Sequence, residues 1–306
     1  MGKLAFIYPG QGAQKAGMGL DFDRACPEAA AVFDRAREVL DFDIRQICFE
    51  GGSLLDRTDY TQPALVTACL AMTAALEAMG VVPDVTAGLS LGEYAAIAAA
   101  GGMSYADAIR AVRARGIFMN EAVPDGQGAM MAVLGLTGEA AARAIAPIDG
   151  IWVANYNCPG QIVITGRTEA MPAAEKALTE AGARRVMALN VSGPFHSPML
   201  SEAGEKLAAV LRETPFTPLD HPYVTNVTAD YVTDVGESAG LLVRQVSSSV
   251  LWEQSMRRLI ADGVDTFVEI GPGKTLAGFM KKIDRSVRVI SISCIEDLKK
   301  VEMLHT

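Results

Sequence analysis

Histidine and cysteine, the residues that most often bind metals or form cross-links, are scarce in this chain. Its 306 residues include three histidines and five cysteines. The cysteines are odd in number, widely spaced and without a CxxC pair: Cys26, Cys48, Cys69, Cys158 and Cys294. This pattern excludes a disulfide framework and a zinc site with the usual ligand spacing. Unpaired cysteines are typical of a reducing compartment, so we expect a cytoplasmic location.

Long apolar runs are also missing. The N-terminal run 4–8 stops at Pro9, which makes it too short for a signal peptide. The run 95–100 consists mostly of alanine and stops at Gly101. No segment approaches the roughly 20 apolar residues that a membrane helix needs, so we expect no membrane insertion.

Basic residues are the minority among the charged ones. The chain has 27 Lys and Arg against 36 Asp and Glu, a net charge of −9. This balance argues against nucleic acid as the main partner. Several basic residues nevertheless gather near the C-terminus: Lys274, Lys281, Lys282, Arg285 and Arg288. Such a cluster is either a solvated helix face or a docking patch for an acidic partner.

Apolar residues are abundant, and their pattern alternates between strand and helix. Half of the chain is hydrophobic, which is ample for a large core. Segments 4–8 and 84–90 are typical of buried strands, whereas 24–40, 62–79 and 104–123 are typical of helices. Strands that alternate with helices predict a parallel sheet covered on both faces. After residue 191 the pattern returns to helices (198–213 and 251–262) and short strands.

The middle of the chain has a different order of elements. We expect four strands, two of which form a hairpin that turns at Cys158–Gly160, and two helices, in this order: strand 129–136, helix 137–148, hairpin 151–166, helix 167–182 and strand 183–190. The order β-α-β-β-α-β is that of a ferredoxin-like fold. We therefore predict a small ferredoxin-like domain at 126–190, inserted into a large domain made of 1–125 and 191–306.

One motif places a serine between two glycines. Gly88-Leu89-Ser90-Leu91-Gly92 fits G-x-S-x-G at the junction of an expected strand and helix. In α/β-hydrolase-like folds such a turn lifts the hydroxyl of a nucleophilic serine out of the chain. The N–H of Leu91 would then lie at a helix start, where it can stabilise an oxyanion. The plainer alternative is a strand–helix turn in which Ser90 caps the helix at Glu93.

A serine nucleophile needs a base, and only three histidines are available. His305 is the penultimate residue, where chains fray, and His221 sits in a proline-flanked turn. His196 lies in a Gly-Pro segment between the two expected domains, which can present its side chain to a cleft. We therefore favour His196. No acidic residue stands out as a third member, so a carboxylate and a backbone carbonyl both remain open.

Two further positions are candidates. Gln11, between Gly10 and Gly12 after the first strand, can supply a second oxyanion donor or belong to an ordinary turn. Arg115 lies in an expected helix with an apolar face. Its spacing allows a surface salt bridge as well as a side chain that projects into a cleft. Gly271-Pro272-Gly273 lacks the spacing of a phosphate loop and is interpreted as a structural turn.

Taken together, seven segments resemble one family, the malonyl-CoA:acyl carrier protein transacylases of bacterial fatty acid synthesis. They occur in the family's order over nearly the whole chain: PGQGAQ, GLSLGEYAA, RGIFMNEAVP, NYNCPGQIVITG, GPFHSP, TNVTAD and VEIGPGKTLAGF. Members of this family also carry an inserted ferredoxin-like domain. Leu89 departs from the histidine that many members have beside the serine, and leucine also occurs there.

The resemblance implies a role for each candidate. Ser90 would be the acylated nucleophile and His196 its general base and acid. The amides of Gln11 and Leu91 would form the oxyanion hole, and Arg115 would pair with the malonyl carboxylate. The main-chain carbonyl of Gln245 would orient the histidine.

The implied reaction carries a malonyl group from malonyl-CoA to the phosphopantetheine thiol of acyl carrier protein, with no metal and no cofactor. Three alternatives remain: a carrier from a polyketide pathway, a serine thioesterase or esterase that uses water as the acceptor, and a silent scaffold that binds the carrier. The resemblance also implies a monomer. Candidate residues for docking the acidic carrier are Arg184, Arg185, Lys274, Lys281 and Lys282.

Overall fold

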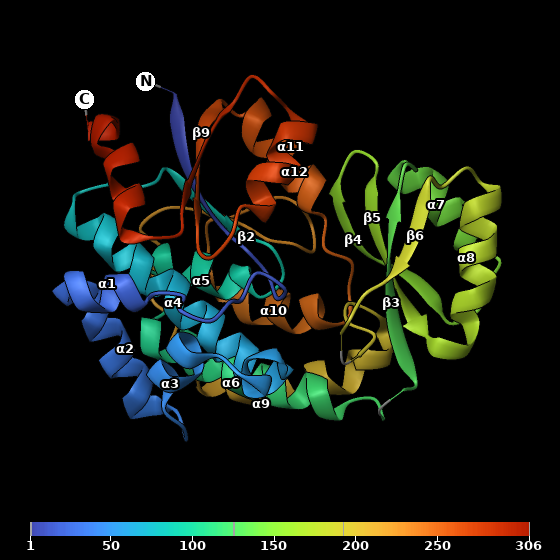
Figure 1. Cartoon of the computed structure of the whole chain (residues 1–306), viewed down its shortest axis with the longest axis horizontal. Helices are drawn as coiled ribbons and strands as arrows, with labels where there is room; N and C mark the ends of the chain where they lie inside the picture. The colour runs from blue at the N-terminus through green and yellow to red at the C-terminus, as the bar shows by residue number, and fades with distance from the viewer. Residues whose placement is uncertain (1, 125, 192, 306) are drawn as a thin grey trace.

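A six-stranded sheet lies at the centre of the larger part of the molecule (Figure 1). The computed structural model describes residues 2–124, 126–191 and 193–305. The strand order is β10-β9-β1-β2-β7-β8, and all neighbours are parallel except β7 and β8. The strands are β1 Lys3–Tyr8, β2 Val85–Gly88, β7 Tyr223–Val224, β8 Tyr231–Val232, β9 Val264–Ile270 and β10 Arg288–Ile292. The predicted parallel sheet is confirmed, with an antiparallel edge strand that the sequence did not indicate.

The central strand β1 shows why this sheet is covered on both faces. Residues Ala5 to Tyr8 are fully buried. Phe6 and Tyr8 pack into one apolar cluster, whereas Ala5 and Ile7 pack into another. Successive side chains of a strand point to opposite faces, so each cluster lies on its own side of the sheet.

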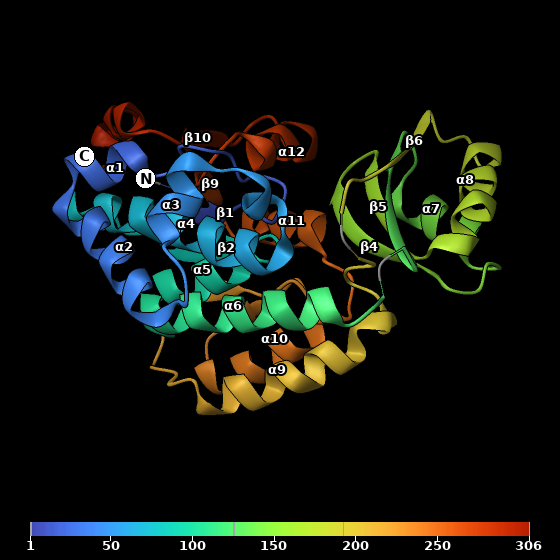
Figure 2. The ribbon, with the colours of Figure 1, turned by 60° about the horizontal axis from the view of Figure 1, so that its bottom comes forward.

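Ten α-helices surround this sheet in the described part of the chain. They are α1 Leu20–Ala25, α2 Pro27–Val39, α3 Ile44–Glu50, α4 Thr58–Ala78, α5 Gly92–Ala99, α6 Tyr105–Glu121, α9 Ser201–Glu213, α10 Ser238–Val246, α11 Trp252–Ala261 and α12 Thr275–Ile283. Short 3-10 helices cover Ser53–Asp56, Thr168–Ala170, Pro198–Leu200, Val235–Glu237, Ile295–Lys300 and Glu302–His305. Helix α6 packs between α4 and α9, as Figure 2 shows.

Two helix boundaries differ from the sequence prediction. The single helix expected at 24–40 is split into α1 and α2, because Cys26 is extended and Pro27 starts a new helix. Helix α4 begins at Thr58 rather than at residue 62, and it contains Pro63. A proline cannot donate to the carbonyl four residues earlier, so the carbonyl of Asp59 is left free for another donor.

The smaller part of the molecule contains a second, antiparallel sheet of four strands in the order β4-β5-β3-β6 (Figure 1). Its elements are β3 Gly128–Leu134, α7 Gly138–Ile145, β4 Ile151–Cys158, β5 Gln161–Arg167, α8 Met171–Glu180 and β6 Arg185–Ala188. Thr137 caps α7, because its Oγ1 accepts from the Ala140 N–H. The predicted ferredoxin-like order is confirmed, while the domain boundaries at 126 and 190 stay a prediction.

The two parts meet along β4. Asn155 forms an isolated bridge with Val250, and the Val250 N–H donates to the carbonyl of Ala154 at 2.8 Å. The chain enters the small sheet after α6 and leaves it after β6, and the two crossings lie close together: a Cβ on Gly128 would lie 2.2 Å from Cδ of Pro194. Within the described residues, no helix combines the length and apolarity needed to cross a membrane.

Candidate active site

Ser90 stands at a sharp turn between β2 and α5. Its φ is 52°, in the left-handed region that non-glycine residues rarely adopt. Gly88 and Gly92 serve a different purpose. A Cβ on Gly88 would lie 1.9 Å from the carbonyl carbon of Gly92, and one on Gly92 would lie 2.3 Å from the carbonyl oxygen of Tyr8. The glycines therefore permit close packing of the turn, and the backbone strain falls on Ser90 itself.

The hydroxyl of Ser90 faces His196. The distance from Ser90 Oγ to His196 Nε2 is 2.7 Å. On the other side of the ring, Nδ1 lies 3.0 Å from the carbonyl oxygen of Gln245 and 3.2 Å from that of Ser248. Carbonyl oxygens only accept, so Nδ1 carries the proton and Nε2 is free to accept one from the serine. Backbone carbonyls, rather than a carboxylate, therefore contact the far side of the ring. Helix α5 has no side-chain cap, so Ser90 Oγ does not cap it.

Burial keeps His196 neutral. The side chain is 5% exposed, and the low-dielectric surroundings, with the Arg115 charge as a second cause, lower the pKa of His196 to about 4. The ring therefore has no proton on Nε2 at neutral pH. It is in the form that a general base requires.

Arg115 projects into the site rather than onto the surface. It is 1% exposed, and its Nη2 donates to Ser90 Oγ at 3.2 Å and to Gln245 Oε1 at 3.1 Å. Nη1 donates to Gln62 Oε1 at 2.9 Å. Its guanidinium lies over the Tyr94 ring at 5.7 Å, and burial lowers the pKa of Arg115. The alternative prediction, a surface salt bridge at Arg115, is therefore wrong.

All of the hydrogen-bond acceptors around Arg115 are neutral. No ion pair to a carboxylate forms at this residue within the described part of the chain, and its Nε has no partner there. A buried guanidinium with no carboxylate in direct contact is costly, and the buried Glu93 carboxylate, linked to it through Gln245, offsets part of that cost. The guanidinium fork can bind a carboxylate with two parallel hydrogen bonds.

The two expected oxyanion donors are available. The N–H groups of Leu91 and Gln11 donate to no other group of the described residues. Leu91 directly precedes the first turn of α5, where unsatisfied N–H groups and the helix dipole favour negative charge. The side chain of Gln11 is engaged elsewhere, since its Nε2 donates to Thr58 Oγ1 at 3.1 Å.

Three residues that sequence reasoning did not select also hold the site. Asn226 accepts from the Ser90 N–H and donates to the Gly88 carbonyl, both at 2.6 Å. Glu93 is fully buried one helical turn after Ser90, and burial raises the pKa of Glu93 to about 7. The third is Gln62. Glu93 and Asn226 had a signal, because they stand in GLSLGEYAA and TNVTAD, two of the segments that carry the family resemblance. Gln62 stands in none of these segments.

Ser90 and His196 open into a cavity of about 630 Å³ between the two parts of the molecule. Its wall combines the small sheet, the loops after β1 and β2 and the start of α12, and includes Gly10–Gln14, Asn155, Asn157, Gln161, Leu189, Phe195, Thr275, Leu276 and Phe279. This volume is in the range of small-molecule sites. A second cavity of about 780 Å³ is lined by His196 but not by Ser90.

The remaining sequence candidates lie outside this cavity. His221 does not line it and is half-buried beside Asp220. Nothing is described of the His305 side chain. The Gly271–Gly273 turn precedes α12, and the carboxylate of Glu269 accepts from the N–H groups of Leu276 and Ala277 at 2.8 and 3.0 Å. The turn is therefore structural, and it brings the start of α12 to the cavity wall.

Comparison with known proteins is consistent with this geometry. A family model described as the acyl transferase domain matches residues 5–302. The malonyl CoA-acyl carrier protein transacylase of Bacillus subtilis (strain 168) is 44% identical over 304 residues, 98% of this chain and 96% of the relative. The crystal structure of the Clostridium perfringens transacylase is 40% identical with a TM-score of 0.95, covering 99% of this chain and 97% of that chain.

A third relative was solved with its partner. It is a malonyl-transacylase in complex with its type II PKS acyl-carrier protein, 35% identical, with a TM-score of 0.95 and coverage of 99% of this chain and 100% of that chain. Because the match extends over nearly the whole sequence, the chain belongs to the acyl transferase family and, within it, to the malonyl CoA-acyl carrier protein transacylases.

Proposed function

We propose that this protein transfers a malonyl group from malonyl-CoA to the phosphopantetheine thiol of acyl carrier protein, through an acyl-serine at position 90, for fatty acid synthesis. One observation carries the proposal. The Ser90 hydroxyl contacts a neutral imidazole on one side, at 2.7 Å, and on the other, at 3.2 Å, a buried arginine that no carboxylate of the described residues contacts directly. A nucleophile beside such a cation suits a substrate whose acyl group ends in a carboxylate.

In the first half-reaction, Ser90 Oγ attacks the thioester carbonyl while its proton passes to His196 Nε2. The tetrahedral oxyanion is held by the N–H groups of Leu91 and Gln11, each of which stabilises the transition state by about 3 kcal/mol. The C–S bond then breaks, and His196 returns the proton to the leaving CoA sulfur. The carbonyls of Gln245 and Ser248 keep Nδ1 protonated throughout.

The second half-reaction runs in reverse. His196 takes the proton of the carrier's thiol, the sulfur attacks the acyl-serine, and Ser90 leaves as the hydroxyl. Because one product departs before the second substrate enters, the kinetics are ping-pong. No metal or further cofactor takes part in either step.

The role of Arg115 is to recognise the free malonyl carboxylate. The arginine sits within reach of the serine oxygen and can pair both carboxylate oxygens. An acetyl group would leave that fork without a charged partner. The same pairing would hold the bound acyl group in place and limit attack by water.

The carrier is expected to dock where the cavity opens between the two parts, with 126–190 acting as the small domain and 1–125 with 191–306 as the large one. Candidate contacts for its acidic surface are Arg184, Arg185, Lys274, Lys281 and Lys282. The solved complex of a relative with a type II PKS carrier keeps a polyketide carrier as the second candidate acceptor. We expect the protein to act as a monomer in the cytoplasm.

The proposal is tested by incubating the protein with malonyl-CoA, then measuring intact mass before and after addition of holo acyl carrier protein. We expect a malonyl adduct on the wild type that moves to the carrier, and no adduct on Ser90→Ala. Loss of the adduct to water at the same rate without carrier would mean a thioesterase. Absence of any adduct on the wild type would mean a protein that only binds the carrier.

A further inference from the structure

A single carboxylate oxygen, Glu93 Oε2, connects the segments that hold the active site. It accepts from the Gln245 side chain, Nε2, at 2.7 Å and from the Asn226 main-chain N–H at 3.2 Å. Glu93 is fully buried and touches neither the cavity nor the reacting atoms. Its effect on chemistry must therefore pass through the two residues that it binds.

Both of those residues hold the backbone of Ser90. The Asn226 side chain accepts from the Ser90 N–H at 2.6 Å, and Gln245 Nε2 donates to the Ser90 carbonyl at 2.9 Å. Ser90 has the strained φ of 52°, which persists only where its surroundings enforce it. One carboxylate oxygen thus supports both contacts that keep the serine in its turn.

Gln245 reaches the other two members of the site as well. Its side-chain Oε1 accepts from Arg115 Nη2 at 3.1 Å, and its main-chain oxygen accepts from His196 Nδ1 at 3.0 Å. The carboxamide works in one orientation only. A reversed amide would face the guanidinium with its NH₂ group and would bring its oxygen against Glu93 Oε2 and the Ser90 carbonyl. The carboxylate therefore determines which way this amide points.

We propose that Glu93 is a positioning residue: by accepting hydrogen bonds from Gln245 and Asn226, it aims Arg115 at the acyl carboxylate and keeps Ser90 in its strained turn. The inference deepens the proposed function and rests on it. Since Arg115 serves only acyl groups that carry a carboxylate, loss of Glu93 lowers malonyl transfer more than acetyl transfer. A purely structural role would lower both equally.

The test compares two variants of similar volume. Glu93→Met removes the acceptor, whereas Glu93→Gln keeps an oxygen that can accept from both donors. Loss of a hydrogen bond in a charged network predicts that Glu93→Met lowers the malonyl-to-acetyl ratio of kcat/KM by about tenfold. Glu93→Gln is expected to stay within about threefold of the wild-type ratio, because its amide oxygen still accepts both N–H groups.

A matched control is Glu269→Gln. Glu269 is also fully buried, and it accepts from the N–H groups of Leu276 and Ala277 at the start of α12 and from the Ser291 hydroxyl. It contacts neither Arg115 nor Gln245. Thermal unfolding of all three variants measures their loss of stability, and Glu269→Gln should lose stability while the malonyl-to-acetyl ratio stays at the wild-type value.

An unchanged ratio in Glu93→Met would overturn the proposal, and so would an equal loss in Glu93→Gln, because the acceptor would then not be what matters. If Glu93→Met does not fold, Gln245→Met removes the same hydrogen bond to Glu93 while it keeps the main-chain oxygen that accepts from His196. An unchanged malonyl-to-acetyl ratio in Gln245→Met would also overturn the proposal. A wild type that never becomes acylated by malonyl-CoA would instead refute the proposed function itself.

Discussion

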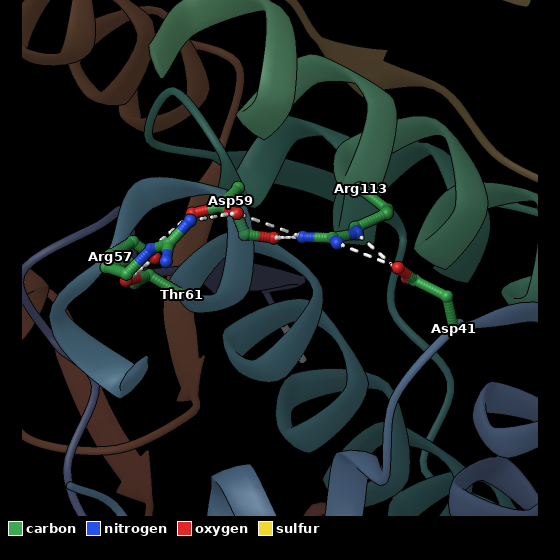
Figure 3. A network of polar contacts seen from close by, with 5 residues as sticks. All are labelled: Asp41, Arg57, Asp59, Thr61 and Arg113. Carbon is green, nitrogen blue, oxygen red and sulfur yellow. Dashed lines mark hydrogen bonds and ion pairs between the residues drawn. The ribbon is translucent and has the colours of Figure 1, made fainter. Parts of the chain in front are cut away.

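Arg113 and Arg115 lie two residues apart on α6, and their surroundings are opposite in kind. At 3.6 residues per turn the two side chains leave the helix about 200° apart. Arg113 binds two carboxylates: both oxygens of Asp41 at 3.1 Å and Asp59 Oδ2 at 3.3 Å, as Figure 3 shows. Arg115 binds no carboxylate among the described residues and contacts the candidate nucleophile instead.

The surroundings of Arg113 are complete without a ligand. Its Nη1 also donates to the Asp59 carbonyl at 2.7 Å, the oxygen that Pro63 leaves free in α4. The guanidinium stacks on Phe42 and Tyr60, and Arg57 binds Asp59 from the other side (Figure 3). This arginine joins α4, α6 and the loop at Asp41. The difference indicates that an arginine whose partners are all supplied by the fold is structural. A buried arginine that no carboxylate contacts directly is instead suited to bind an anionic ligand.

If Ser90 and Arg115 form the active site, the largest loss of activity should follow removal of the base, His196, which contacts Ser90 together with Arg115. His196→Ala is expected to slow acylation by malonyl-CoA by about 10⁴-fold, because no other group can take the Ser90 proton. Rapid-quench mass spectrometry of the acyl-enzyme measures this rate. A loss below tenfold would contradict the assignment of the base.

The difference between the two arginines is tested directly by replacing each of them with alanine. Arg115→Ala should lower kcat/KM for malonyl transfer about a hundredfold, the worth of a charge-assisted paired contact, while acetyl transfer is kept or rises. Steady-state transfer to holo acyl carrier protein from malonyl-CoA and acetyl-CoA gives both values. Equal losses on the two substrates would mean that Arg115 does not recognise the carboxylate.

The pH dependence of acylation sharpens the comparison further. The base must be neutral, and the pKa of His196 is lowered to about 4 by burial first and by the Arg115 charge second. The acylation rate should therefore be flat above about pH 5 and fall about tenfold per unit below pH 4. Arg115→Ala should move this inflection to higher pH, and Arg113→Ala should leave it in place. An inflection near 6.5 in the wild type would contradict the buried, neutral ring.

The same pKa bears on folding stability with a definite sign. The unfolded chain binds a proton on His196 below about pH 6.5, whereas the folded chain binds it only below about 4. Stability from this group is therefore present above pH 6.5 and is lost as the pH falls toward 4.

The smallest effect on transfer should come from Arg113. Arg113→Ala is expected to cost about 2–3 kcal/mol of stability, because it leaves the buried Asp59 carbonyl without this donor and the Asp59 carboxylate with Arg57 alone, while the exposed Asp41 pair and the ring stacking add little. Its malonyl-to-acetyl ratio should equal that of the wild type. Chemical denaturation and the transfer assay measure the two quantities. A changed ratio would show that the two arginines are not independent.

The sequence predicts a feature well when the residues that determine it are close together in the chain, and poorly when they are far apart. The strand–turn–helix around Ser90 and the β-α-β-β-α-β order are local patterns, and both appear in the structure. The direction of an arginine side chain is not local. Arg113 and Asp41 are 72 residues apart, and Arg115 and Gln245 are 130 apart. Spacing along α6 therefore could not separate the structural arginine from the other.

The same limit explains what was missed at the serine. Asn226 lies 136 residues from Ser90, and although it stands in the resembling segment TNVTAD, that segment does not indicate that it holds the turn. The glycines of the motif predicted a sharp turn correctly. Only the packing of Gly88 against Gly92, and of Gly92 against Tyr8, shows that they are needed for close approach.

The central claim, that Ser90 takes a malonyl group because the guanidinium of Arg115 is free to pair with its carboxylate, has one direct measurement. The wild type, Arg113→Ala and Arg115→Ala are each mixed with equal amounts of malonyl-CoA and acetyl-CoA, quenched and digested, and the acyl group on the peptide containing Ser90 is identified by mass. The account predicts malonyl on the wild type and on Arg113→Ala, and acetyl on Arg115→Ala. The same acyl group on all three, or an acyl group on a different residue, would contradict it.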